Sequence, residues 1–163
     1  QYVLKDVRNS IESYKNALSY GEDPYLYGNL GWGYYLLGDF DSAVDNSLKA
    51  LAMKPELNYA RMNLGISHIK QGAYKSAYDA YESLLKYSPE HDEYEGGIRD
   101  LMELQHEFPG VYPFSNFVLG QLYKQQGRNM EANETLHKFL RQNFPVAYWH
   151  HKARSLLSEM ESE

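Results

Sequence analysis

The sequence contains no cysteine, which excludes disulfide bonds and thiolate metal sites. It also has no apolar run as long as a membrane span and no cluster of basic residues. With a net charge of −6, the chain is a poor candidate for binding nucleic acid or an anionic membrane. We therefore expect neither a nucleic-acid partner nor direct insertion into a membrane.

Motifs for catalysis and for cofactor binding are missing as well. The six histidines show no His-Glu-x-x-His arrangement and no other recognisable metal spacing. The pair Gly96 and Gly97 lacks the spacing of a phosphate-binding loop, and no Lys-Ser or Lys-Thr follows it. We therefore expect a chain that is not an enzyme and that holds no cofactor or metal.

The composition is that of a folded protein. Hydrophobic residues make up 43% of the 163 residues and aromatic residues 15%, with sixteen tyrosines among them. A chain of this length can bury its own core, so we expect a single domain over residues 1–163. Because it starts at Gln1 without a methionine, we expect a fragment of a longer protein. The composition fits the cytoplasm and the periplasm equally.

A sparse sequence pattern occurs twice in the chain. The first copy is NLGWGYYLLGDFDSAVDNSLKALAMKP (residues 29–55), and the second is NLGISHIKQGAYKSAYDAYESLLKYSP (residues 63–89). Both copies open with Asn-Leu-Gly, place a glycine seven residues later and a Ser-Ala pair four residues further on, and close on a proline. The offset between them is 34 residues. A fixed period of about 20–50 residues is typical of stacked supersecondary units.

Each copy predicts two antiparallel helices joined by a tight turn. Because Gly31 and Gly65 have no side chain, we expect the paired helices to approach most closely there. Gly38 follows the first helix, where a left-handed residue is favoured, and Asp39 or Asp41 can cap the next helix. The second helix has small residues on its inner face and ends before a proline: Ala43, Ser47, Ala50 and Pro55.

This pattern resembles the tetratricopeptide repeat family, whose marked positions carry a large residue, Leu, Gly, Tyr, Ala, Phe, Ala and Pro. The first copy matches with Tyr27, Leu30, Gly31, Tyr34, Ala43, Ala50 and Pro55 and departs at Ser47. The second copy matches with Leu64, Gly65, Ala77, Tyr81 and Pro89. A weaker third copy shows Leu119, Gly120, Tyr123, Gly127, Ala132, Leu136 and Phe139. The resemblance implies an all-α fold of tandem helix-turn-helix repeats stacked as a right-handed α-solenoid.

The repeat register divides the chain into segments. Repeats are predicted over 24–57, 58–91 and 113–145. Residues 3–20 have the stripe of a second helix and represent a partial unit. Residues 92–112 are an extra helix or a degenerate unit, with the helix predicted over 92–109. Residues 146–161 form an amphipathic stripe that predicts a capping helix.

In tetratricopeptide domains a second stripe on the first helices lines a concave groove that holds a peptide. The resemblance therefore implies a groove formed by Tyr25, Asn29, Trp32, Tyr35, Tyr59, Met62, Asn63, Ile66, Phe114 and Phe117. The alternative is that several of these side chains pack against neighbouring helices. Asn29 and Asn63 hold the same place in successive repeats, and their amides could pair with a peptide backbone or face water.

We interpret the chain as a non-catalytic protein–protein interaction module or scaffold. Its expected partner is a protein or peptide segment with apolar or aromatic side chains. One alternative is a regulatory or scaffold part of a larger enzyme or of an envelope-assembly protein. Another alternative is an RNA-binding helical repeat, but the net negative charge of the chain argues against it. An open apolar face on residues 3–20 would favour a homodimer or an upstream segment of the same protein.

Overall fold

The computed structural model describes residues 2–87 and 89–162. These residues form ten α-helices and no strand, so the predicted all-α fold is confirmed. The chain divides into two compact units, Gln1–Pro89 and Glu90–Glu163, which we call the first and the second unit. Two predictions concern how these units associate: a single domain over residues 1–163 and a right-handed stack of the repeats. Both stay predictions.

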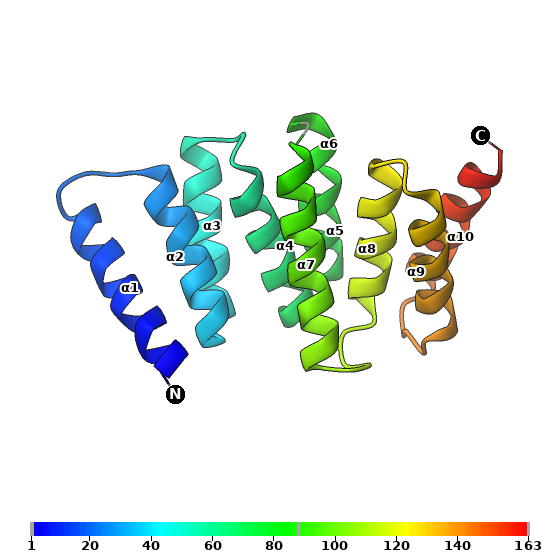
Figure 1. Cartoon of the computed structure of the whole chain (residues 1–163), viewed down its shortest axis with the longest axis horizontal. Helices are drawn as coiled ribbons and strands as arrows, with labels where there is room; N and C mark the ends of the chain where they lie inside the picture. The colour runs from blue at the N-terminus through cyan, green and yellow to red at the C-terminus, as the bar shows by residue number, and fades with distance from the viewer. Residues whose placement is uncertain (1, 88, 163) are drawn as a thin grey trace. The chain divides into compact units, whose positions relative to one another are not determined.

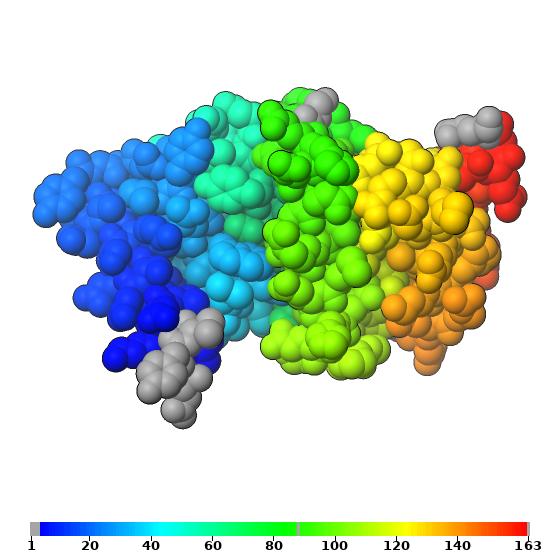
Figure 2. Space-filling model, in the orientation of Figure 1, coloured from blue at the N-terminus to red at the C-terminus, as the bar shows by residue number. Residues whose placement is uncertain are grey.

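The first unit contains six helices, and the helices of each repeat lie side by side in antiparallel pairs (Figure 1). They are α1 (Tyr2–Leu18), α2 (Pro24–Leu37), α3 (Phe40–Met53), α4 (Asn58–Gln71), α5 (Tyr74–Glu82) and α6 (Leu84–Tyr87). Helix α2 packs against α1, α3 and α4, while α4 packs against α2, α3, α5 and α6. Helix α1 lies at one edge of this unit, where most of its side chains are exposed (Figure 2).

The second unit contains four helices. They are α7 (His91–Glu107), α8 (Phe114–Gln125), α9 (Asn129–Arg141) and α10 (Ala147–Glu161). Helix α8 packs against α7, α9 and α10. The helix predicted over 92–109 is therefore confirmed as α7. At its start, the Glu90 backbone N–H donates a hydrogen bond to the Glu93 carboxylate at 2.9 Å, which satisfies a donor that the helix itself leaves free.

The turn inside each repeat depends on one glycine in the left-handed region. Gly38, Gly72 and Gly127 have φ angles of 79°, 73° and 71°. Each lies just beyond the first helix of its pair, where a side chain would strain the backbone. In the first repeat Asp39 then caps α3, because its Oδ1 accepts a hydrogen bond from the Ser42 backbone N–H at 3.1 Å. Both predictions for this turn are confirmed.

The two helices of each pair meet at a glycine on the first helix. A Cβ atom added at Gly31 would lie 2.5 Å from Ser47 Oγ, and one added at Gly65 would lie 2.4 Å from the Tyr81 ring. The third pair repeats this contact, since a Cβ at Gly120 would lie 2.5 Å from Leu136 Cγ. The expected close approach at Gly31 and Gly65 is confirmed, because these distances leave no room for a side chain.

Within residues 2–87 and 89–162, none of the helices combines the length and the apolar character needed to cross a bilayer.

Candidate partner-binding surface

The start of α2 is fixed by the residues before it. Asp23 Oδ1 accepts hydrogen bonds from the backbone N–H groups of Tyr25 at 2.7 Å and Leu26 at 3.1 Å. Pro24 occupies the first helical position, where its missing N–H costs nothing. This cap sets the register that places the next side chains on one stripe of the helix.

A partly exposed apolar surface follows from that register. Side chains three and four residues apart on α2 share one face of the helix. Tyr25 and Leu36 are 48% and 41% exposed, and Asn29, Trp32 and Tyr35 between them are partly buried. We call the following five residues the α2 surface: Tyr25, Asn29, Trp32, Tyr35 and Leu36.

The aromatic rings of the α2 surface are held by their neighbours. The Trp32 and Tyr35 rings stack with centroids 5.0 Å apart and planes 18° apart. At the other end of the helix, the Lys54 ammonium lies 4.6 Å from the centre of the Tyr25 ring and donates a hydrogen bond to its hydroxyl. That hydrogen bond raises the pKa of Lys54 above its ordinary value. The surface is therefore preordered, which lowers the entropy lost when a partner binds.

A cleft of about 290 Å³ separates part of α2 from α1. We call it the α1–α2 cleft. Its walls are Val7, Ser10 and Tyr14 of α1 and Asn29, Trp32 and Leu36 of α2, with Asp6 and Gly33 completing the lining. A Cβ atom at Gly33 would lie 2.9 Å from Ile11 Cγ1, so the two helices touch at the base of the cleft.

Tyr59 lies beside the α2 surface on the neighbouring helix α4. Its ring covers Gly28, where an added Cβ would lie 2.5 Å from the Tyr59 hydroxyl. That hydroxyl donates a hydrogen bond to the Tyr25 carbonyl at 3.3 Å. Burial, and to a lesser extent the nearby Tyr25 and Asp23, raises the pKa of Tyr59 to about 12. The hydroxyl therefore keeps its proton, and its role as donor, at neutral pH.

Three predicted groove residues of α4 do not lie on an open surface. Met62, Asn63 and Ile66 are only 5%, 6% and 1% exposed. The Asn63 amide donates a hydrogen bond to the Gly28 carbonyl at 3.4 Å, inside the contact between α4 and α2. The placement of these three residues along an open groove is therefore wrong, because they are buried in the folded chain.

Phe114 and Phe117 of α8 are also misplaced by the groove prediction. Both are fully buried in an aromatic core of the second unit. The ring centroids of Phe114 and Trp149 are 4.8 Å apart, and those of Phe117 and Phe139 are 5.5 Å apart. These two residues instead agree with the alternative that predicted groove side chains pack against neighbouring helices. Their rings are covered by side chains that come later in the chain.

Some residues of the cleft were not foreseen. Ser10 and Tyr14 of α1 and Leu36 of α2 line it, yet none was assigned to a binding surface from the sequence. The available signal was the predicted open face of residues 3–20, which indicated an unpartnered helix but not the wall that α2 contributes.

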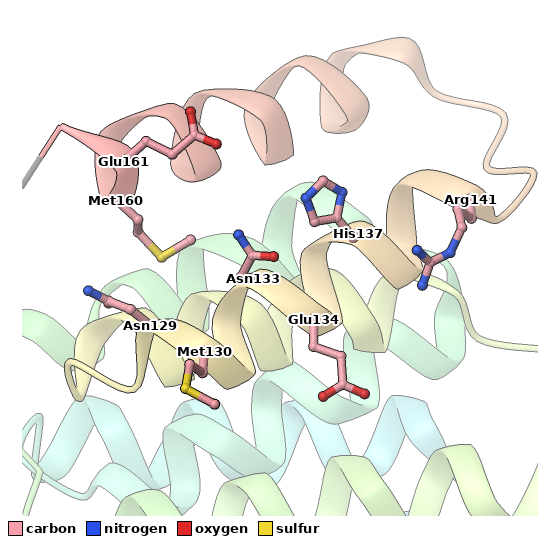
Figure 3. Close-up of a pocket in the computed structure, with 8 residues that line it drawn as sticks. All are labelled: Asn129, Met130, Asn133, Glu134, His137, Arg141, Met160 and Glu161. Atoms are coloured by element: carbon pink, nitrogen blue, oxygen red, sulfur yellow. The ribbon is translucent and has the colours of Figure 1, made fainter.

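A larger hollow of about 570 Å³ lies between α9 and α10 in the second unit. Six of its eight lining residues are polar or charged. Figure 3 shows that Met130 and Glu134 point away from α10 while Asn133 and His137 lie toward it. These side chains do not converge on one point. Across the described part of the chain, no group of three or more His, Cys, Asp or Glu residues could hold a metal. The hollow therefore does not favour a defined ligand.

Comparison with known proteins agrees with this architecture. Residues 29–92 match the family described as tetratricopeptide repeat. Residues 29–92 therefore carry repeats of the tetratricopeptide type. A peroxisomal targeting signal receptor of Candida albicans is 38% identical over 77 residues, which is 47% of this chain and 13% of that protein. A mitochondrial import receptor subunit, TOM70 of Saccharomyces cerevisiae, is 33% identical over 99 residues, 61% of this chain and 16% of that protein.

Solved structures share the fold. The crystal structure of the MamA protein has a TM-score of 0.52 and 21% identity, covering 82% of this chain and 62% of that one. A tetratricopeptide repeat protein from Parabacteroides merdae has a TM-score of 0.50 and 20% identity, covering 100% of this chain and 69% of that one. At this identity the likeness concerns the repeat fold alone. The chain spans only 13% and 16% of the lengths of the two receptor proteins.

Proposed function

We propose that the chain is a non-catalytic protein-interaction module that binds an apolar or aromatic segment of a partner on the α2 surface. The observation that carries this proposal is the group of large apolar side chains left partly exposed on one stripe of α2, from Tyr25 through Trp32 to Leu36. Such outward stripes often mark partner sites. The receptor names of the related proteins favour the same class of function.

The chemistry of the surface favours burial of apolar area over ion pairing. Burial contributes about 25 cal/mol per Å² and depends little on salt. Exposed ion pairs contribute only about 0–1 kcal/mol each and are screened by salt. A few aromatic anchors usually supply most of the binding energy, and Trp32 is the largest side chain on the surface. The Asn29 amide would add a hydrogen bond to the partner backbone.

The test is a selection followed by calorimetry. Peptides are selected from a random display library on the wild-type chain, and the tightest binder is titrated at low and moderate salt. Trp32→Ala should weaken binding by about 2 kcal/mol, roughly 30-fold. The matched control is Tyr148→Ala, which removes an aromatic residue that is 55% exposed on α10. It should leave the affinity unchanged.

The affinity should also change little between the two salt concentrations. Steep salt dependence together with an indifferent Trp32 would contradict the proposal, because the partner would then be charged and bound elsewhere.

A further inference from the structure

A small pocket lies in the second unit, where α7 ends, α8 begins and α9 ends. Figure 1 shows these three helix ends on the same side of that unit. The volume of the pocket is about 180 Å³, several times the share of liquid volume that one water molecule takes. We call it the Asn116 pocket, and its lining includes Gln105, Phe108, Tyr112, Asn116, Lys138 and Gln142.

The third repeat has a short side chain where the other two repeats have long ones. Asn116 stands four residues before the glycine at which its helix pair meets, and Tyr27 and Arg61 hold the same place in the first and second repeats. Tyr27 packs against the buried cluster around Ala50, and the Arg61 guanidinium donates a hydrogen bond to the Pro55 carbonyl at 2.6 Å. The shorter Asn116 leaves space that a long side chain would occupy.

Asn116 contributes a buried hydrogen-bond acceptor to the pocket. The residue is only 2% exposed. Its Nδ2 donates a hydrogen bond to Gln142 Oε1 at 2.9 Å, whereas its Oδ1 accepts none from the described residues. A buried polar atom without a partner is destabilising, and native proteins satisfy nearly all such atoms. The pocket therefore favours a group that brings a hydrogen-bond donor to this oxygen.

Lys138 contributes the opposite preference, for an acceptor. Its ammonium donates a hydrogen bond to Gln105 Oε1 at 3.3 Å, and the Gln105 amide donates in turn to Ser115 Oγ at 3.1 Å. Because an ammonium has three donors, Lys138 can hold an oxygen of a ligand as well. Among the described lining residues Lys138 is the only charged one, so no carboxylate of the lining attracts a cationic ligand.

A primary amide matches both preferences, because its NH₂ group donates and its carbonyl oxygen accepts. A carboxylate would instead place an acceptor against Asn116 Oδ1, and an ammonium would meet the like charge of Lys138. The Phe108 and Tyr112 rings, whose centroids are 5.8 Å apart, add apolar surface to the lining. Methylene groups beside the amide would be buried against that surface, which favours glutamine over the shorter asparagine.

We propose that the Asn116 pocket binds the side-chain amide of a glutamine in a peptide segment of a partner protein. The amide NH₂ donates to Asn116 Oδ1, its carbonyl oxygen accepts from Lys138, and the methylene groups lie against Phe108 and Tyr112. None of these residues belongs to the α2 surface. The inference therefore goes beyond the proposed function, and the two stand or fail separately.

The test is an NMR titration of the isotope-labelled full chain with capped amino acids that share one backbone. The probes are the N-acetyl methylamides of glutamine, glutamate and norleucine. The glutamine probe should shift the side-chain amide resonances of Asn116 and Gln142 in a saturable manner, with a Kd of about 1 mM, as expected of so small a ligand. The glutamate and norleucine probes should bind at least about ten-fold more weakly at neutral pH.

Two cations in the last turn of α9 provide a matched pair of variants. Lys138 and Arg141 are both exposed, and only Lys138 lines the Asn116 pocket. Lys138→Met should weaken binding of the glutamine probe at least about five-fold, while Arg141→Met should leave it unchanged. Asn116→Leu, which removes the acceptor at nearly constant size, should abolish the saturable shift of the Gln142 amide. Circular dichroism checks that each variant is folded.

Several outcomes would overturn the inference. Without a saturable shift, the Asn116 oxygen would be left to an ordered water alone. Equal binding of the norleucine probe would show that the side-chain amide is not recognised, and equal binding of the glutamate probe would make the pocket an anion site. Binding that is indifferent to Lys138→Met would contradict the role of the ammonium. Free glutamine that binds ten-fold or more tightly than the capped probe would assign the pocket to the amino acid rather than to a partner segment.

Discussion

Tyr25 and Phe114 occupy the same position in the first and third repeats, yet one is 48% exposed and the other is fully buried. The difference comes from what covers them. The centroid of the Phe114 ring lies 4.8 Å from that of Trp149 and 5.7 Å from that of Phe144. Both of these residues follow α9, the second helix of the third repeat. Tyr25 is instead flanked by the flexible side chain of Lys54. A repeat position thus serves as surface or as core, depending on the segments around it.

The largest expected effect separates these two aromatic residues. Phe114→Ala should lower the free energy of unfolding by about 3–5 kcal/mol, because it opens a cavity in a closed aromatic core. Tyr25→Ala should lower it by less than about 1 kcal/mol, since much of that side chain is already in water. Chemical denaturation followed by circular dichroism measures both values. Equal costs would contradict the assignment of one residue to the core and the other to the surface.

The cost of adding a side chain where paired helices meet should also differ between the two units. Gly120→Ala sets a new Cβ against Leu136 Cγ, a branched carbon in a fully buried side chain, and should cost about 1–3 kcal/mol. Gly31→Ala meets Ser47 Oγ, which can move to another rotamer, and the gain in helix propensity from glycine to alanine offsets part of the strain. We therefore expect a cost below about 1 kcal/mol at Gly31. Thermal melts of the two variants, taken side by side, would reveal a reversed order.

The smallest stability effect is expected at Ser47 itself. This hydroxyl is fully buried, and the described residues offer it no hydrogen-bond partner. A buried polar group without a partner is destabilising, so Ser47→Ala should stabilise the chain by up to about 1 kcal/mol. Leu136→Ala, the same position in the second unit, should instead destabilise it by about 2–5 kcal/mol. A Ser47→Ala variant that melts at lower temperature would indicate a hydrogen bond to that hydroxyl.

The helices, the turns and the close contacts between paired helices could be predicted from the sequence because their causes are local. Gly38 marks a turn through its own backbone freedom, and Asp39 caps the helix that follows it within three residues. Gly31 and Gly65 mark close helix contacts because the constant offset between repeats shows that the same position is kept small. Each of these statements requires only the residues of one repeat.

The surface could be predicted only in part, because exposure depends on neighbours outside the repeat. Trp32 and Phe117 are both large aromatic residues on a first helix, and nothing in either repeat shows that only Phe117 is fully buried. Asn29 and Asn63 hold one repeat position, but only Asn63 is closed inside a helix contact. The packing of distant segments decides these cases, and a periodic pattern does not encode it.

The two tryptophans test the difference between the open and the closed aromatic surfaces most directly. Trp149→Phe leaves Trp32 on α2, and Trp32→Phe leaves Trp149, which is 3% exposed in the core of the second unit. Quenching by acrylamide of each folded variant measures how accessible the remaining indole is. We predict a quenching constant for Trp32 several-fold larger than that for Trp149, together with emission at longer wavelength. Equal quenching, or a Trp32 that is as protected as Trp149, would contradict the account of α2 as an open binding surface.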